Sequence, residues 1–269
     1  MIGATVGAGV GPYQGLHGLI IDALLSVRMI TASGDIVTAS EDENEDLFWA
    51  VRGAGANFGI ITSATYKVFD APNNGLLVQA DFIYNSSVNA SLWELLQAWD
   101  ETYPKEMGLT MEATYNHTSN QVRSHHRRSC KGNLLTHTLI EPQTVFLAFM
   151  SFFGPQKAAQ PWLDRFIALG PTRWQNQTIS WNNLGQQTGF GAGANACVRG
   201  IYNNHYSIGA NQTSATTYTH AVNQFASFAA SRPWYKGAFV VQRFNTAATL
   251  AVPKHKRGVY PGRDFGTLM

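Results

Sequence analysis

The spacing of apolar and polar residues predicts a chain of short strands and a few helices. Alternation, or a short apolar run between turn residues, is typical of a strand, whereas a spacing of three to four residues is typical of a helix. By these rules the expected strands are 26–31, 35–38, 60–69, 76–84, 109–115, 144–153 and 237–244. The expected helices are 45–52, the segment from Ser91 to Pro104, 156–169 and 215–230.

Turn and cap residues agree with several of these boundaries. Ser33-Gly34 lies between the first two strands and is a hairpin signal. Asn44 is placed to cap the first helix, and Gly53 follows its end. Residues 71–75, Ala-Pro-Asn-Asn-Gly, form a natural boundary between two parts of the chain. Residues 172–212 are rich in Gly, Asn and Gln and show little periodicity.

The order of these elements predicts an α+β fold, in which an antiparallel sheet carries helices on one face. The helix that opens at Ser91, at capping-box spacing from Glu94, has one apolar face made of Leu92, Leu95, Leu96 and Trp99. The aromatic residues of this part are expected in the core rather than around a substrate, namely Trp93, Trp99, Phe152, Phe153, Phe225 and Phe228.

Composition bounds the class of protein. A chain of 269 residues, 45% hydrophobic and 13% charged, can bury the core of one large or two modest domains. A net charge of +2 gives no argument for nucleic acid or an anionic membrane, and no apolar run reaches the roughly 20 residues that span a bilayer. Cys130 and Cys197 fit neither a disulfide framework nor a metal site of usual spacing. We therefore expect no metal, no nucleic acid and no membrane as partners.

Residues 122–143 interrupt two strands that would otherwise join as a hairpin. Two functional interpretations stay open: His125-His126 with Cys130 could hold a metal, and the basic residues could meet phosphate. The basic residues are Arg123, Arg127, Arg128 and Lys131. Adjacent histidines rarely converge on one ion, and no aromatic residue interleaves for base stacking, so we favour a disordered insertion.

The hypothesis for its origin is a translated intron. Val122-Arg123 can be encoded by GTACGT, Leu135-Thr136 can contain CTAAC, and Gln143 can be CAG, which are a fungal 5′ splice start, a branch-point word and a 3′ acceptor. The hypothesis is wrong if transcript sequencing shows that the most abundant mRNA retains the codons for residues 122–143.

Glycine is concentrated in two segments near the start of the chain. Residues 7–11 read Gly-Ala-Gly-Val-Gly, followed by Gly15-Leu16-His17-Gly18-Leu19, and residues 52–59 read Arg-Gly-Ala-Gly-Ala-Asn-Phe-Gly. Such backbone can approach a flat or phosphate-bearing ligand without side-chain bulk, often with positive φ. Tight turns in a packed domain are the alternative interpretation.

The order of these segments, with Asp22, Asp46-Leu47-Phe48-Trp49-Ala50 and Ile60-Ile61-Thr62, resembles the berberine-bridge-enzyme-like, FAD-linked oxidoreductases. These belong to the vanillyl-alcohol-oxidase type with a PCMH-type FAD-binding domain, and the resemblance is closest to fungal members. It is dense over the first quarter and continues at Phe152-Phe153-Gly154-Pro155, Ala251-Val252-Pro253 and Tyr260-Pro261-Gly262-Arg263-Asp264.

The resemblance implies a division of the chain and a cofactor. Residues 1–72 would be part of the FAD-binding domain, 73–246 an α+β substrate domain, and 247–269 a segment returning to the FAD domain. Main-chain groups recognise a flat ring edge without side-chain bulk, and the implied FAD-binding residues are Gly7, Ala8, Gly9, Gly11, Gly18, Leu19, Gly59, Ile60 and Ile61. His17 lies inside the motif and could face the flavin or have a structural role in the turn.

The resemblance also implies an activity. A complete relative oxidises a small organic molecule, often a secondary metabolite, with hydride transfer to flavin, a general base and O₂ as electron acceptor. An acid often found where Gln242 stands is absent, so no catalytic residue is assigned. Pocket residues are expected from Tyr84, Tyr115, Phe149 and Phe244 and from residues 172–212.

Parts of the family pattern lie outside this sequence. The pyrophosphate-binding loop and the covalent flavin attachment points, a histidine and often a cysteine, precede the first glycine segment, so we expect a chain truncated at both ends. A catalytically inactive remnant, or a fragment with incorrect gene boundaries, without stable FAD binding is the alternative. Family resemblance implies secretion, although no signal peptide is seen, and the possible N-glycosylation sites are Asn85, Asn89, Asn116, Asn176 and Asn211.

Overall fold

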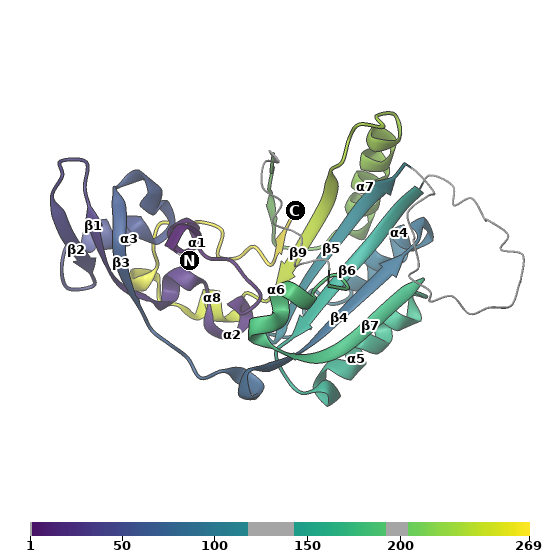
Figure 1. Ribbon diagram of the computed structural model, residues 1–269, viewed down its shortest axis with the longest axis horizontal. Coiled ribbons are helices and arrows are strands. Elements are labelled where there is room, and N and C mark those ends of the chain that lie inside the picture. Colours follow the sequence, from purple (N-terminus) through teal and green to yellow (C-terminus); the bar gives the residue numbers. More distant parts are fainter. Residues whose placement is uncertain (1, 118–142, 192–203) are drawn as a thin grey trace, which may run out of the picture.

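The computed structural model describes residues 2–117, 143–191 and 204–269, and it contains two antiparallel sheets (Figure 1). The small sheet has the strand order β2-β1-β3, with β1 (Leu24–Ile30), β2 (Ile36–Ser40) and β3 (Ile60–Tyr66). The large sheet has the order β7-β4-β6-β5-β9-β10-β8. Its strands are β4 (Leu76–Tyr84), β5 (Met107–Asn116), β6 (Gln143–Phe152), β7 (Arg173–Ser180), β8 (Gly209–Ala210), β9 (Ala238–Phe244) and β10 (Thr267–Leu268).

The large sheet confirms the predicted α+β arrangement. Helices α4 (Asn89–Gln97), α5 (Gln156–Ala168) and α7 (Ala215–Ala230) cover one of its faces (Figure 1). Alternate strand residues pack beneath them, and the largest of the fully buried side chains there are Trp93, Trp99, Tyr84, Phe82, Phe146 and Phe166. Burying such aromatic side chains is the main favourable contribution to folding of this part.

The small sheet packs one face against α3 (Glu45–Ala54). The predicted hairpin is confirmed, with Ile30 opposite Ile36 in register. Its core is small and consists of Leu24, Val27, Met29, Ala39, Phe48 and Val51. Asn44 does not cap the helix: its φ is 50°, and its amide Nδ2 donates to the carbonyl oxygen of Thr38 at 2.7 Å.

Other expectations are corrected. Residues 172–212 contain the unpredicted strand β7, which lies at the edge of the sheet and is mostly polar, so alternation gave no signal. Phe228 is 44% exposed rather than in the core. The helix α4 begins at Asn89, and Ser91 Oγ donates to the carbonyl of Val88 instead of capping. Cys130, Cys197 and nearly all of 122–143 lie outside the described residues, although Gln143 begins β6.

Short helices lie between the two sheets, where α1 (Ile2–Gly7), α2 (Gln14–His17) and α8 (Ala247–Ala251) are seen in Figure 1, with α6 (Leu184–Gln187) beside the large sheet. The ring of Tyr13 stacks on Phe153 at 4.0 Å between centroids and meets Trp181 edge-on at 4.4 Å. His17 stacks on Phe69 at 4.3 Å. Aromatic contacts therefore join the start of the chain to the large sheet.

Residues 247–269 pack against the first part of the chain and then add the short strand β10 to the large sheet. The guanidinium of Arg263 donates to both carboxylate oxygens of Asp22, at 2.7 and 3.0 Å, across 241 residues of sequence. Asp22 Oδ2 also accepts from the backbone N–H of Leu19 at 2.9 Å. Because both side chains of the pair are buried, breaking it would leave an uncompensated charge.

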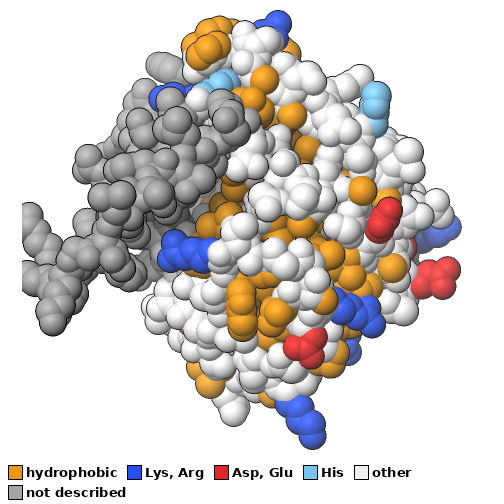
Figure 2. Space-filling view, turned by 90° about the vertical axis from the view of Figure 1, so that its right-hand side faces the viewer, with side chains coloured by type: hydrophobic (Ala, Val, Ile, Leu, Met, Phe, Trp, Pro, Cys, Tyr) orange, Lys and Arg blue, Asp and Glu red, His pale blue; other side chains and the backbone are white. Residues whose placement is uncertain are grey.

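No helix in the described part of the chain is both long and apolar enough to cross a bilayer. The face in Figure 2, which is the right-hand side of Figure 1, shows Lys and Arg side chains scattered singly, with Asp and Glu between them. The Lys and Arg side chains of the described residues in this view form no continuous basic surface of the kind that binds nucleic acid.

Candidate active-site groove

A groove of about 490 Å³ lies on the face of the large sheet that the helices leave uncovered. Its volume falls within the range of small-molecule sites, and most of its lining surface is apolar. The lining residues are Pro12, Gly108, Thr110, Glu112, Leu147, Phe149, Ser151, Leu184, Thr188, Gly189, Gln242 and Phe244.

Strand register explains why these residues share a face. In β5, Met107, Leu109 and Met111 point toward the helices, so the residues between them point into the groove. Gly108 lies opposite Ser151 of β6 and Phe244 of β9, and Thr110 lies opposite Phe149 and Gln242. One phase of the alternation therefore lines the groove, and the other phase forms the core.

Two of the four aromatic residues expected in the pocket line the groove, Phe149 and Phe244. The expectation was wrong for Tyr84, which is fully buried under α5 and donates its hydroxyl hydrogen to the carbonyl of Phe166 at 2.9 Å. Tyr115 shares the phase of Ala113, on the helix side of the sheet. The strand register places Phe149 and Phe244 on the groove side and Tyr84 and Tyr115 on the helix side. The sequence could not supply this register.

Residues 172–212 contribute to the groove through Leu184, Thr188 and Gly189, as expected. The buried carboxylate of Asp81 holds this part of the groove wall against the sheet. Asp81 is fully buried and accepts hydrogen bonds from Gln79 Nε2 at 2.8 Å, Gln175 Nε2 at 2.9 Å and the backbone N–H of Phe190 at 2.8 Å. Three donors compensate its desolvation and hold the turn at Gly189, where φ is 68°, against the sheet.

Glu112 of β5 and Gln242 of β9 are two of the polar side chains in this lining. Burial raises the pKa of the Glu112 carboxyl above its ordinary value. Gln242 Nε2 donates to Thr110 Oγ1 at 3.4 Å. The sequence analysis missed Glu112, although it falls on the polar phase of a strand that alternates clearly and could have been found there.

The two glycine segments lie side by side. α1 packs against α3 and the turn at Gly55–Asn57. A Cβ on Gly55 would approach Val6 Cβ to 2.7 Å, and one on Gly53, where φ is 134°, would meet the backbone N of Tyr260 at 2.7 Å. The C-terminal segment is thus packed against the second glycine segment.

The structure assigns most of these glycines to packing of the chain on itself. A Cβ on Gly9 would lie 2.3 Å from Ile20, one on Gly18 2.8 Å from Asp22, and one on Gly59 2.1 Å from the carbonyl oxygen of Ile30. All three have positive φ. Gly7 and Gly11 differ, because an added Cβ would meet no described atom within 4 Å beyond the adjoining backbone.

The other expected cofactor residues fall in different environments. Ala8 and Leu19 are buried together in a small cluster, with Ala8 at φ 150°. Ile60 is 71% exposed, whereas Ile61 packs on the core of the small sheet. His17 is held by its stacking on Phe69, which favours the structural role, and burial lowers its pKa.

The backbone at Gly7 and Gly11 is therefore open on the side where a side chain would project. Pro12 follows directly and forms part of the groove wall, where it lies within 2.7 Å of an added Cβ on Gly108. The segment that the sequence assigns to the cofactor thus reaches the rim of the groove. Of the residues assigned to the cofactor, Gly7 and Gly11 leave this edge open to a flat group such as a flavin, whereas Gly9, Gly18 and Gly59 are filled by the chain itself.

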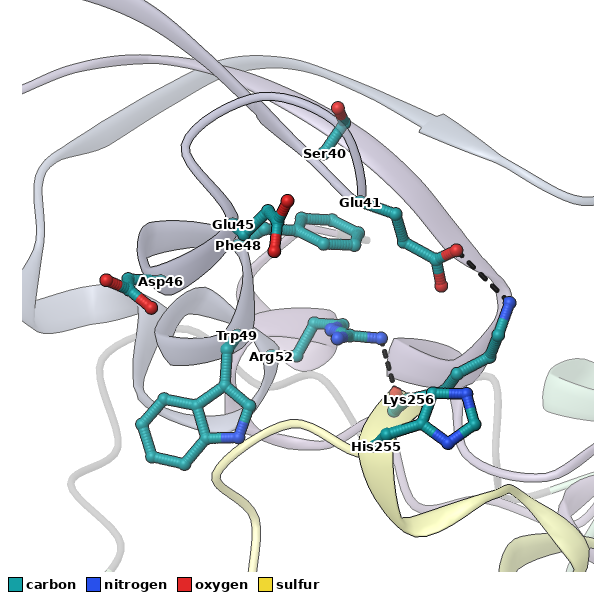
Figure 3. A pocket seen from close by; sticks show the side chains of 9 residues that line it. All are labelled: Ser40, Glu41, Glu45, Asp46, Phe48, Trp49, Arg52, His255 and Lys256. Atoms are coloured by element: carbon teal, nitrogen blue, oxygen red, sulfur yellow. Dashed lines mark hydrogen bonds and ion pairs between the residues drawn. The ribbon is translucent and has the colours of Figure 1, made fainter.

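A second cavity, of about 340 Å³, lies beside α3 (Figure 3). Arg52 points into it and donates to the carbonyl oxygen of Lys256 at 2.6 Å, and Lys256 pairs with Glu41 at 3.2 Å. Burial lowers the pKa of Arg52. Because acidic and basic side chains already pair here, the cavity shows no preference for one class of ligand.

Metal chemistry finds no support in residues 2–117, 143–191 and 204–269, where no group of three or more His, Cys, Asp and Glu side chains is placed to hold an ion. His125, His126 and Cys130 lie outside these ranges.

No family model matches the chain. Among curated proteins it is similar to the FAD-linked oxidoreductase tazL of Aspergillus terreus, at 60% identity over 100% of this chain and 50% of the relative. It is also similar to the FAD-linked oxidoreductase azaL of Aspergillus niger, at 42% identity over 94% of this chain and 49% of the relative. The chain spans about half the length of these relatives.

Solved structures agree on the fold. A Physcomitrella patens BBE-like 1 protein matches with a TM-score of 0.72 at 21% identity, covering 99% of this chain and 53% of that one. A chitooligosaccharide oxidase matches with a TM-score of 0.67 at 21% identity, covering 99% and 52%. The fold is thus that of flavoproteins of the vanillyl-alcohol-oxidase type. Together with the sequence relatives, it shows that the chain belongs to the berberine-bridge-enzyme-like, FAD-linked oxidoreductases.

Proposed function

We propose that this chain supplies the substrate groove and one wall of the flavin site of an oxidase that acts on a small organic molecule. Residues 1–72 form the cofactor side, 73–246 the substrate side, and 247–269 the return segment. The proposed FAD-binding residues are Gly7, Ala8, Gly9, Gly11, Gly18, Leu19, Gly59, Ile60 and Ile61. Bound FAD would accept a hydride from the substrate and pass its electrons to O₂.

The observation that carries the proposal is the continuity of residues 7–12. Gly7 and Gly11 have open space beside them, and Pro12 belongs to the groove wall. A ring along this backbone would therefore lie at the mouth of the groove. Phe149, Phe244 and Leu147 would receive the apolar body of a substrate and exclude water from it. An aromatic secondary metabolite fits such a lining.

The alternative is a binding protein that takes a small molecule without FAD. It is favoured by the packing of Gly9, Gly18, Gly53 and Gly59 against the chain itself, since their conformations need no ligand to explain them. It is also favoured by the exposure of Ile60.

Reconstitution with FAD separates the two. The purified chain is mixed with FAD, freed of excess cofactor and examined for flavin absorbance and quenched flavin fluorescence. The proposal expects bound flavin that aromatic alcohols bleach without O₂ and that recovers with formation of H₂O₂ when O₂ returns. Colourless protein that retains its fold but no FAD would support the binding protein instead.

Secretion and glycosylation belong to the same proposal. Asn85 and Asn211 are exposed and could carry glycans on a secreted chain, and at Asn211 this would disturb only one surface bond, from its Nδ2 to Asp264 Oδ2 at 3.0 Å. Asn89 could not do so without cost, because its amide bridges α4 and α7 by bonds to Thr219 and Asn223. Mass spectrometry of protein secreted from a fungal host would show glycan at the first two sites and none at Asn89.

A further inference from the structure

The groove contains a carboxylate that has no partner among the described residues. Glu112 is the ionisable residue among the described residues that line it. Within the described part of the chain, no hydrogen bond or ion pair reaches its carboxyl. A carboxylate in a partly dry groove loses hydration, so an unpaired one is costly to keep.

The described strands and helix around Glu112 offer it no cation. It lies opposite Leu147 on β6 and Val240 on β9, both apolar. β6 and α6 contain no charged residue. The cation of β9, Arg243, belongs to the opposite phase of its strand and pairs with Asp100 on the helix side of the sheet. Consistently, burial raises the pKa of Glu112 toward the range useful for proton transfer near neutral pH.

Two other polar residues on this face, Asp81 and Gln242, are not suited to accept a proton from a substrate. Asp81 is the other carboxylate on this face, but three donors from the protein occupy it and it is fully buried. Gln242 stands where an acid would be expected, yet an amide cannot accept a proton, and it is bonded to Thr110. Glu112 is one strand away from Gln242, across the pairing of β5 with β9.

We propose that Glu112 is the catalytic residue that takes the hydroxyl proton of a substrate bound in this groove. The inference rests on the proposed function. With an alcohol as substrate, the O–H bond breaks and its proton goes to the Glu112 carboxylate. Bound FAD would take the hydride with its two electrons as the C–H bond breaks, and the carbon–oxygen bond would become C=O. The substrate class is an apolar, aromatic molecule with a hydroxyl group that reaches Glu112.

The first test needs no flavin. The chain is labelled with ¹³C at the glutamate carboxyl carbons, and the resonance that Glu112→Gln removes is followed with pH and with 4-nitrophenol as the probe. We expect this resonance to titrate above the usual glutamate range and to move when the probe binds. Glu112→Gln should weaken probe binding about tenfold, as for loss of a hydrogen bond to a charged group.

The matched control is Glu101→Gln, the same change at an exposed glutamate outside the groove. It should remove a resonance with ordinary titration and leave probe binding unchanged. A Glu112 resonance indifferent to the probe, or equal binding by Glu112→Gln, overturns the inference.

The second test uses protein loaded with FAD, bleached by veratryl alcohol without O₂. Glu112→Gln should slow bleaching by about 100-fold or more without changing the flavin spectrum. It should also abolish the rise of the rate with pH through the Glu112 pKa, because the carboxylate is the active form. Unchanged bleaching would refute the proton transfer. A chain that takes up no FAD contradicts the proposed function instead, and then the resonance and probe binding decide the role of Glu112.

Discussion

The two sheets of this chain differ in how they are stabilised. The large sheet has a full helical layer on one face and a core that includes Trp93, Trp99 and Phe146. The small sheet has one helix and a small core, and large apolar side chains around it stay exposed, such as Ile60 at 71% and Val68 at 87%. The large sheet can bury its own apolar surface, whereas the small one depends on contacts from elsewhere.

Those contacts come from distant parts of the sequence. The pair between Arg263 and Asp22, the bond from Arg52 to the carbonyl of Lys256, and the close packing of Gly53 on Tyr260 all join residues 247–269 to the first part of the chain. The comparison teaches that a groove built on a self-sufficient sheet can keep its shape while the flavin side depends on long-range ties.

The largest effect is expected in the core of the large sheet. Phe146→Ala removes a fully buried ring that meets Trp93 edge-on, and it should cost about 3–5 kcal/mol. Urea unfolding followed by tryptophan fluorescence measures it. Because the fold depends on this sheet, amide protection should fall in both sheets; loss confined to β6 would contradict the idea that this core holds the whole chain.

Breaking the ion pair between Arg263 and Asp22 should lower the free energy of unfolding by somewhat less than Phe146→Ala does. The effect should be local to the small sheet. Arg263→Met leaves Asp22 buried without its cation, at a cost of about 3 kcal/mol. Hydrogen exchange should show lost protection in β1 and β3 but not in β4 to β6. The double variant Arg263→Met with Asp22→Leu removes both charges and should recover part of the loss; no recovery would mean that the charge pair is not the cause.

A smaller effect is expected at the junction of the sheets. Tyr13→Leu keeps an apolar side chain but removes the stacking on Phe153 and the edge contact with Trp181. Such contacts contribute about 1 kcal/mol beyond the burial of area. Thermal unfolding measures the loss, with Tyr206→Leu at a 92% exposed site as the control. Equal losses in both variants would exclude a role for the junction.

The smallest effect is expected at Glu112, where the substitution should stabilise the folded chain instead of destabilising it. The folded pKa of Glu112 is raised above its ordinary value, so its stabilising contribution is complete below the ordinary pKa and is lost as pH rises through the folded pKa. Near neutral pH, Glu112→Gln should therefore melt at a higher temperature than the unaltered chain. The difference should vanish below about pH 4, where the carboxyl is protonated in both states. A variant that melts lower near neutral pH would show that the carboxylate has a partner.

Local sequence determined much of the architecture. The hairpin of β1 and β2, the strands β4, β5, β6 and β9 and the helices α5 and α7 lie where spacing and turn residues predicted them, because each has a strong apolar periodicity of its own. The class of cofactor followed from the order of the glycine segments. Strand β7 could not be found this way, since it is a polar edge strand defined by its pairing with β4.

The tertiary structure alone decided what those residues face. Glycines that suggest a ligand in the sequence proved to accommodate Ile20, Ile30 and Tyr260, because close approach of two backbones leaves the same signature whether or not a ligand is present. Likewise, Tyr84 and Phe149 are equally apolar in sequence, yet register places one in the core and the other in the groove. Side-chain direction in a sheet depends on pairing between distant strands, which no local pattern specifies.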